Sequence, residues 1–407
     1  MHEVTSRQST SSGPVRWALA AESASAFGTG MTGPLLVIYL HSARGLPLGL
    51  ATVVGGVSAL ISLLGNPSGG VLTDRFGPWR TAAGGLVVAA LGTAALGVAG
   101  ELWQILLAVG VGGLGLSVSM PAQDTVLGRL SPEHRSRVFA LRSLVFNAGL
   151  GVGALAGTVV IDRQNPASFT VAYVCDALTF LVALCCLAPL RHVAGRGSGG
   201  SRTPWISPVP ADPRLLRLCA LQVVFTVVGL GQIQYAFAGW IEYHDASPRL
   251  MSLAFLANVA TVVIVQMPAL RVTRGRLRTR LMAGMCVCLA LVWLVTLVSG
   301  GRSQLSMGAL LAIAAALLGL GEVLHAISLP GLVNELAPEE LRGRYNGAVI
   351  LAGTTGMILG PVITGGLLQM NRPYLLMTVL AGAALGAAAL CLRLERHVPR
   401  AANAVDG

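Results

Sequence analysis

The chain has 407 residues, of which 54% are hydrophobic and 11% are charged, and its mean hydropathy is +0.71. A soluble globular domain carries about 25% charged residues, so this composition excludes an ordinary soluble protein. The net charge of +11 comes from arginines that lie near the ends of apolar runs, a placement that argues against a nucleic-acid-binding surface.

Apolar runs of about 20 residues, long enough to cross a bilayer core of about 30 Å, recur along the whole chain. They predict an all-α membrane protein with no sizeable soluble domain. The first run is too long for a cleaved signal peptide and leads directly into the second. Twelve transmembrane helices are predicted, near residues 16–40, 48–72, 79–98, 102–127, 137–161, 168–190, 214–240, 251–270, 280–299, 304–329, 342–368 and 374–393.

The arginines are distributed unevenly between the two sides of the predicted membrane. If the N-terminus is cytoplasmic, most arginines fall in the N-terminal tail, the even-numbered turns and the C-terminal tail. Five face the other side: Arg44, Arg163, Arg249, Arg302 and Arg372. This bias follows the positive-inside rule, so it predicts a multi-pass protein of the bacterial inner membrane with both termini in the cytoplasm.

The second half of the chain repeats the first. The stretch from Leu130 to Gly157 is echoed by the stretch from Leu336 to Gly366. Four matched pairs are each 207 residues apart: Arg135 and Arg342, Arg137 and Arg344, Gly149 and Gly356, Gly153 and Gly360. A membrane protein built from two equivalent halves has a natural cleft between them, which is typical of a transporter.

The repeat and one polar linker divide the chain. Residues 191–213 are rich in Gly, Ser, Pro and Arg, as a flexible tether is. We therefore expect two pseudo-symmetric six-helix bundles, 1–190 and 214–407, joined by a cytoplasmic linker at 191–213.

The turn after the second predicted helix reads GGVLTDRFGPWR. It matches the pattern G-x-L-x-D-R-x-G-x-x-R/K of the turn between helices 2 and 3 in the major facilitator superfamily, so the chain as a whole resembles that family. The matching residues are Gly70, Leu72, Asp74, Arg75, Gly77 and Arg80.

The resemblance implies a conformational latch at this turn that stabilises the outward-facing state. Asp74 would sit at the positive N-terminus of helix 11, and Arg75 or Arg80 would pair with Asp124. Gly70 would permit close contact with a neighbouring helix, and Gly77 would allow the tight turn. The alternative is that these charges only set the topology.

Glycines recur at helical spacing in predicted helices 5 and 11. Helix 11 contains a GxxxGP element made by Gly356, Gly360 and Pro361. In family exporters that couple to protons, this element occurs in helix 5, where the present chain has Gly149 and Gly153 but Ala154 in place of proline. Small-residue packing of helices is the alternative interpretation.

Ionisable residues inside spans are the candidates for coupling, because each costs about 2.5 kcal/mol or more in the bilayer. Glu22 lies in helix 1, and Glu322 and His325 share a face of helix 10. In this family, helices 1, 4, 7 and 10 line the cavity. We expect Glu22 first and Glu322 second to exchange protons, unless they only snorkel or pair with an arginine.

Other polar residues inside the spans have two interpretations each. Arg142 in helix 5 either pairs with an acid, which we favour, or contacts an anionic substrate. Asp176 in helix 6 is expected to be a structural hydrogen-bonding group rather than a coupling residue. Gln232, Gln234 and Tyr235 in helix 7 either bind substrate or bond neighbouring helices.

The sequence indicates no metal site, no disulfide framework and no cofactor. The seven cysteines form no CxxC, and GVGGLG at Gly110–Gly115 lies inside an apolar span where no nucleotide would reach it. We predict a monomeric, proton-coupled exporter of an amphipathic small molecule, surrounded by membrane lipids. The alternatives are a transporter of one specific metabolite and a non-transporting membrane scaffold or sensor.

Overall fold

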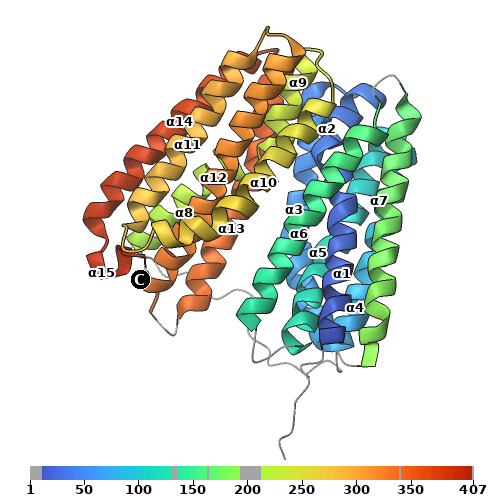
Figure 1. Cartoon of the computed structure of the whole chain (residues 1–407), viewed down its shortest axis with the longest axis horizontal. Helices are drawn as coiled ribbons and strands as arrows, with labels where there is room; N and C mark the ends of the chain where they lie inside the picture. The colour runs from blue at the N-terminus through green and yellow to red at the C-terminus, as the bar shows by residue number, and fades with distance from the viewer. Residues whose placement is uncertain (1–11, 131–134, 163–164, 193–211, 339–340, 406–407) are drawn as a thin grey trace, which may run out of the picture.

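A computed structural model describes residues 12–130, 135–162, 165–192, 212–338 and 341–405. Throughout these ranges the chain is helical apart from turns and one isolated β-bridge, between Leu277 and Ala404. Most of the predicted linker and part of the repeated turn after Leu130 lie outside the described residues. Figure 1 shows two groups of helices, one blue to green and one yellow to red.

The first group comprises six long helices and four short helical segments. The long helices are α1 (Ser12–Thr32), α3 (Leu48–Phe76), α4 (Pro78–Val98), α5 (Leu102–Leu130), α6 (Arg135–Val160) and α7 (Pro166–Leu187). The short segments are η1 (Gly33–Leu35), α2 (Leu36–Ile38), η2 (Tyr39–Ala43) and η3 (Ala188–His192).

The second group repeats this plan with its own short segments. Its first helix is built from α8 (Pro213–Phe225), η4 (Thr226–Leu230), η5 (Ile233–Phe237) and α9 (Ala238–Tyr243). The helices that follow are α10 (Arg249–Val272), α11 (Arg278–Ser299), α12 (Gln304–Leu336), α13 (Arg342–Gln369), α14 (Pro373–Leu394), η7 (Glu395–His397) and α15 (Arg400–Asn403).

Ten helical segments within the described ranges are long and apolar enough to cross a membrane, and they match the third to twelfth predicted spans. The first two predicted spans also fold as helices, α1 and α3. However, α1 carries Arg16 and Glu22, and the apolar segment recognised in α3 is the shorter Leu48–Ser58. The structure therefore establishes a multi-pass helical protein, and the count of twelve stays a prediction.

The first helix of each group is interrupted. After α1 the chain passes through a 3-10 turn at Gly33–Leu35, where Pro34 lacks the N–H that an α-helix needs, and then through the π-helical η2. The corresponding helix of the second group contains two π-helical segments separated by Gly231 and Gln232. Irregular backbone at membrane depth is tolerated where protein or a cavity surrounds it, and here η1 and η5 contact each other across the junction of the two groups.

Glycines allow equivalent helices to pack closely in the two groups. A Cβ on Gly149 would lie 2.9 Å from the carbonyl oxygen of Ser23, and one on Gly153 would collide with the carbonyl oxygen of Phe27, so α6 packs directly on α1. In the second group a Cβ on Gly356 would lie 2.7 Å from the carbonyl oxygen of Val223. The glycine faces of predicted helices 5 and 11 are therefore packing surfaces against the first helix of each group.

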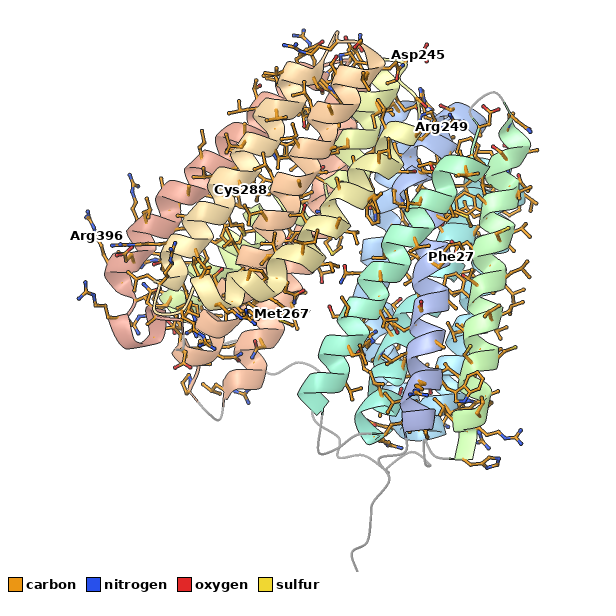
Figure 2. The ribbon with its side chains drawn as sticks, in the orientation of Figure 1. Phe27, Asp245, Arg249, Met267, Cys288 and Arg396 are labelled. Atoms are coloured by element: carbon orange, nitrogen blue, oxygen red, sulfur yellow. The ribbon has the colours of Figure 1, made fainter. Side chains whose placement is uncertain are left out.

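The two groups meet along α3 with α13 and along α6 with α10. Gly49 packs against the backbone of Gly365, and Gly56 packs against the ring of Pro361. Figure 1 shows the groups close together near α2 and α9 and separated toward the ends where α6 and α13 begin. Figure 2 places Asp245 and Arg249 where the groups converge, and Arg396 toward the opposite end of the second group.

The turn between α3 and α4 depends on one of its two predicted glycines. Gly77 has φ +89° and ψ 152°, a conformation that is almost restricted to glycine. The close helix contact expected at Gly70 is not made in this structure, because a Cβ there would have no neighbour within 4 Å. Gly69 makes the close helix contact instead, because a Cβ on Gly69 would lie 2.7 Å from the carbonyl oxygen of Val118 in α5.

We expect Gly77→Ala to destabilise the protein by about 1–3 kcal/mol, the usual strain of a side chain in this backbone region. Gly84→Ala is the matched control, because Gly84 is helical and exposed, and a Cβ there meets nothing within 4 Å. Thermal unfolding of the purified variants in detergent measures the difference. Equal midpoints for the two variants would contradict the backbone argument.

Candidate functional site

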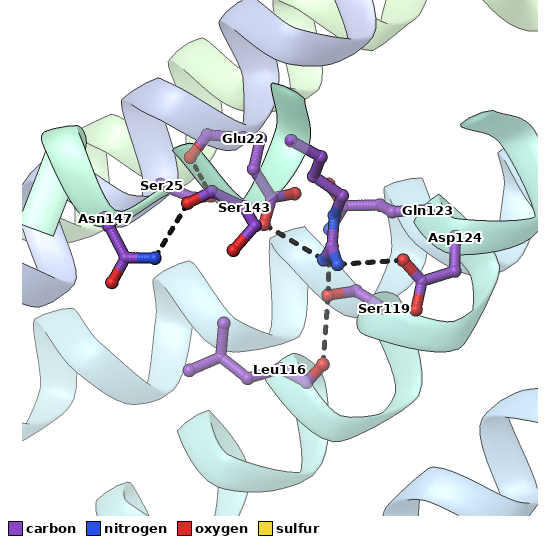
Figure 3. Close-up of polar contacts among 9 residues, drawn as sticks. Glu22, Ser25, Leu116, Ser119, Gln123, Asp124, Ser143 and Asn147 are labelled. Carbon is purple, nitrogen blue, oxygen red and sulfur yellow. Dashed lines mark hydrogen bonds and ion pairs between the residues drawn. The ribbon is translucent and has the colours of Figure 1, made fainter. Parts of the chain in front are cut away.

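A three-residue charge cluster joins three helices of the first group. The Nη2 atom of Arg142 lies 3.0 Å from Oε1 of Glu22, and its Nη1 atom lies 3.0 Å from Oδ1 of Asp124. These residues come from α6, α1 and α5. The close-up in Figure 3 labels the two acids, Glu22 and Asp124, and marks the ion pairs by dashed lines.

The local packing explains why Arg142 meets Glu22. Arg142, Gly149 and Gly153 are seven and four residues apart, so they share one face of α6. Glu22 and Ala26 share a face of α1 by the same spacing, and Ala26 is the residue against which Gly149 packs. The close approach of the two helices thus brings the arginine and the glutamate together.

The three side chains differ in their access to solvent. The side chain of Glu22 is 8% exposed and that of Arg142 is 19% exposed, whereas that of Asp124 is 42% exposed. The Asp124 oxygen nearest Arg142 is at ion-pair distance but lacks hydrogen-bond geometry, so this contact is less directional. The cluster therefore has a buried acid at one end and an accessible acid at the other.

The charges of the cluster do not balance. Two carboxylates share one guanidinium group, so the ionised cluster carries one excess negative charge. The nearby amides bond elsewhere: Gln123 donates to Ser119 at 3.4 Å, and Asn147 donates to the carbonyl oxygen of Ser143 at 2.8 Å. A proton or a cationic group that enters the cluster would neutralise the excess charge.

The predicted pairing of Asp124 with Arg75 or Arg80, which belongs to the outward-facing state, is not made in this structure. Asp124 pairs with Arg142, and the Arg75 guanidinium lies 5.2 Å from the ring centroid of its neighbour Phe76. Asp74, Arg75 and Arg80 are exposed, and among the described residues none of them has an ion-pair partner. The two ends of the predicted latch are not engaged here.

The candidates of helix 10 lie in the second group, apart from this cluster. His325 contacts Oε1 of Gln222 through its Nε2 atom at 2.8 Å. Glu322 precedes His325 by three residues on α12 and is half-buried. Gln222 was not among the predicted site residues. A sequence pattern does not distinguish an intramembrane glutamine that bonds a neighbouring helix from one that binds substrate.

The three candidates of helix 7 have different surroundings. Gln232 is buried and committed to the protein, because its amide donates to the carbonyl oxygen of Val227 at 2.7 Å and accepts from Thr364 at 2.8 Å. A Cβ on Gly360 would lie 2.9 Å from this amide, so helix 11 packs against it. Gln234 lies beside Gly33, and Tyr235 packs on Gly55, both across the junction of the two groups.

A polar contact at the convergent end was also missed. The hydroxyl of Ser42 in η2 donates to Oε2 of Glu242 in α9 at 2.8 Å, and His41 lies 3.9 Å from the same oxygen. Glu242 is buried although it lies just past the predicted seventh span. Its role depends on η2 from the other half of the chain, which no local pattern reveals.

Comparison with known proteins identifies the family. The model of the Major Facilitator Superfamily matches residues 18–244 and 224–407, which together cover nearly the whole chain. The chain belongs to this superfamily of membrane transporters, and it is a transporter rather than an enzyme. That the model matches twice agrees with the repeat seen in the sequence.

Two curated relatives show the range of names in this family. The Uncharacterized MFS-type transporter YttB of Bacillus subtilis is 24% identical over 343 residues, covering 83% of this chain and 84% of that protein. The Multidrug resistance protein MdtH of Shigella dysenteriae is 24% identical over 301 residues, covering 72% of each.

Solved structures share the fold at low identity. The POT family transporter PepTSo aligns with a TM-score of 0.79 at 16% identity, covering 94% of this chain and 98% of that chain. An auto inhibited POT family peptide transporter aligns with a TM-score of 0.77 at 14% identity, covering 95% and 97%. At these identities the likeness concerns the fold alone.

We expect Arg142→Met to destabilise the protein, by up to about 3–5 kcal/mol, because it leaves Glu22 as an unpaired buried charge. Adding Glu22→Gln should recover much of this loss. Adding Asp124→Asn should recover less, about 1 kcal/mol or below, because that acid is already half exposed. Thermal unfolding of all single and double variants forms the cycle, and additive effects for Arg142 and Glu22 would argue against a coupled pair.

Proposed function

We propose that this protein is a proton-coupled secondary transporter of the bacterial plasma membrane that exports an amphipathic small molecule by alternating access. The observation that carries the proposal is the charge cluster of Glu22, Arg142 and Asp124, which has one negative charge in excess. A proton and a cationic or polar substrate would compete for that charge. Competition of this kind couples the export of one to the entry of the other.

The arrangement of the two groups supports alternating access. They are in contact at the end of Ser42 and Glu242 and diverge at the other end, which the arginine distribution assigns to the cytoplasm. In this orientation the conformation faces inward and both termini are cytoplasmic. The halves 1–190 and 214–407 would rock about their junction, tethered by residues 191–213.

Coupling requires that proton and substrate prefer different conformations. In the inward-facing form, the half-exposed Asp124 offers a route from the cytoplasmic side to the buried Glu22. Protonation of either acid leaves one neutral pair with Arg142, so it removes the cost of holding an excess charge between closing helices. The protonated cluster would favour closure, and the ionised cluster would favour an open, hydrated state.

The cargo class follows from the relatives and from the spans. Some relatives are named multidrug resistance proteins, and the charges inside the described spans are few. Both features favour an amphipathic compound over a highly charged one. The transporter would work as a monomer among membrane lipids, with protons and one small molecule as its partners.

A second candidate is the transport of one specific metabolite. It is favoured by the likeness in fold to peptide transporters and by Ala154 in place of the proline of the GxxxGP element. Drug-susceptibility panels in cells that express the protein, set against uptake of single labelled metabolites such as dipeptides, separate the two. Resistance to several unrelated compounds supports the exporter.

We expect Glu22→Gln to abolish transport of ethidium driven by a pH gradient, because it removes the excess negative charge for which the proton and this cationic amphipathic probe would compete. Everted membrane vesicles report the transport through ethidium fluorescence. Glu101→Gln is the matched control, because Glu101 is an exposed acid beyond the helices. If Glu22→Gln and Glu322→Gln both transport at the normal rate, neither acid is a coupling site.

We expect Asp74→Asn to slow transport but to leave membrane insertion and thermal stability unchanged, because Asp74 is exposed and unpaired in the inward-facing form. Its charge would act only when the turn meets the N-terminus of α13 in the opposite conformation. Expression level, unfolding temperature and vesicle transport are measured on the same preparations. Full transport activity would remove the latch from the mechanism.

A further inference from the structure

A second polar site lies inside the first group of helices. A cavity of about 320 Å³, open on one side, is lined by residues of α1, α3, α4, α5 and α7. Its wall is mainly apolar, but several polar side chains from all five helices line it: Thr32, Asn66, Thr93, Ser117, Tyr173 and Asp176. Thr32 follows Glu22 by ten residues, so the site is about 15 Å further along α1 than the charge cluster.

Asp176 is the only acid in the lining, and it is 4% exposed. The hydroxyl of Thr32 donates to its Oδ2 atom at 2.6 Å, whereas its Oδ1 atom is buried without a hydrogen-bond partner. A Cβ on Gly28 would collide with Oδ1, so a glycine in α1 leaves room for this carboxyl group. Within the described ranges no arginine or histidine forms an ion pair with Asp176.

Tyr173 provides a second unsatisfied group in the same cavity. It lies one helical turn before Asp176 on α7, it is 4% exposed, and its hydroxyl is buried without a hydrogen-bond partner. Buried polar atoms are almost always bonded to protein or to ordered water. Asp176 and Tyr173 both line the cavity, and each has one buried oxygen without a hydrogen-bond partner.

The neighbouring charged groups do not compensate Asp176. The ring of Tyr39 in η2 stacks near that of Tyr173, with centroids 4.7 Å apart, and Arg44 donates to the Tyr39 hydroxyl at 2.7 Å. The rings of Tyr39 and Tyr173 therefore separate Arg44 from Asp176. The other helices around the cavity contribute hydroxyl, amide and apolar groups.

We propose that this cavity is a hydrated binding site for one monovalent cation, which is either a proton carried on Asp176 or a sodium ion held by it. An isolated carboxylate in low-dielectric surroundings is costly, and a single positive charge removes that cost. The cavity is roomy enough for several waters, which would complete the shell of the cation. The exposed Asn66 and Met120 in its lining mark where the cation enters.

The site is independent of the Arg142 cluster and goes beyond the proposed function. Binding at Asp176 does not require that the protein export a drug or that Glu22 exchange a proton. A role of this cation in coupling would rest on the proposed function. For this reason the test measures whether a cation occupies the site at Asp176, and it does not measure transport.

The test uses the purified full-length protein with isotope-labelled aspartate, in buffers of constant ionic strength made with sodium or choline. Infrared spectra over a pH range follow the carboxyl bands, and thermal unfolding follows stabilisation by sodium. Asp176→Asn is compared with the wild type. Glu22→Gln is the matched control, because it removes an acid of the other cluster and should leave the Asp176 signals intact.

A proton site predicts a protonated aspartate band that titrates and is lost in Asp176→Asn. A sodium site predicts a rise in unfolding temperature specific to sodium, lost in the same variant. Either result supports the site and identifies its ion. A protonated band that persists at every pH without a sodium effect would mean a purely structural acid and would overturn the proposal, as would signals unchanged in Asp176→Asn.

Asp176→Asn could fail to fold, and Tyr173→Phe then serves as the second variant. It removes only an unsatisfied hydroxyl, so the fold should survive. The proposal predicts that the titration of the wild-type band, or its sodium stabilisation, shifts in Tyr173→Phe. An unchanged titration and an unchanged sodium effect in this variant would contradict a cation and its waters in the cavity.

Discussion

The close contact between α1 and α6 is the constraint on which the candidate site depends. Gly149 and Gly153 bring the two backbones together, and the same face of α6 carries Arg142. Because the helices touch, Arg142 reaches Glu22 at 3.0 Å in a buried position and also approaches Asp124 on α5. A larger residue at either glycine would separate the helices and with them the charges. Small-residue packing and the charge cluster are thus one feature of the fold.

The repeat preserves this packing but not this chemistry. Gly149 and Gly153 have counterparts in Gly356 and Gly360, which pack α13 on the first helix of the second group. The residues 207 positions after Glu22, Asp124 and Arg142 are Gly229, Gly331 and Val349. The second half uses neutral bonds instead, such as those of Gln232 with Val227 and Thr364. The two halves therefore share one arrangement of helices, but the charge cluster lies in the first half and the Gln232 bonds of the second half are neutral.

The junction between the halves is formed largely by close contacts of small residues. Examples are Gly49 with Gly365 and Gly56 with Pro361, and the halves are also joined by the polar contact of Ser42 with the buried Glu242. The helices that carry much of it are interrupted near Pro34 and Gly231. Short irregular segments absorb changes in angle more readily than continuous helices do. Such a junction suits a transporter, in which two rigid bodies change their mutual orientation.

Hydrophobic length, arginine placement and the internal repeat, all properties of the sequence alone, determined that this is a helical membrane protein with duplicated halves. The turn signature around Asp74 and Gly77 also pointed to the correct family. Only the tertiary structure decided that Asp124 pairs with Arg142 rather than with Arg75 or Arg80, that Gly69 replaces Gly70 in the helix contact, and that Asp176 faces a cavity. The reason is physical: hydrophobicity and charge bias act on each segment separately. Which side chains meet depends on the rotation and approach of helices that are distant in the sequence.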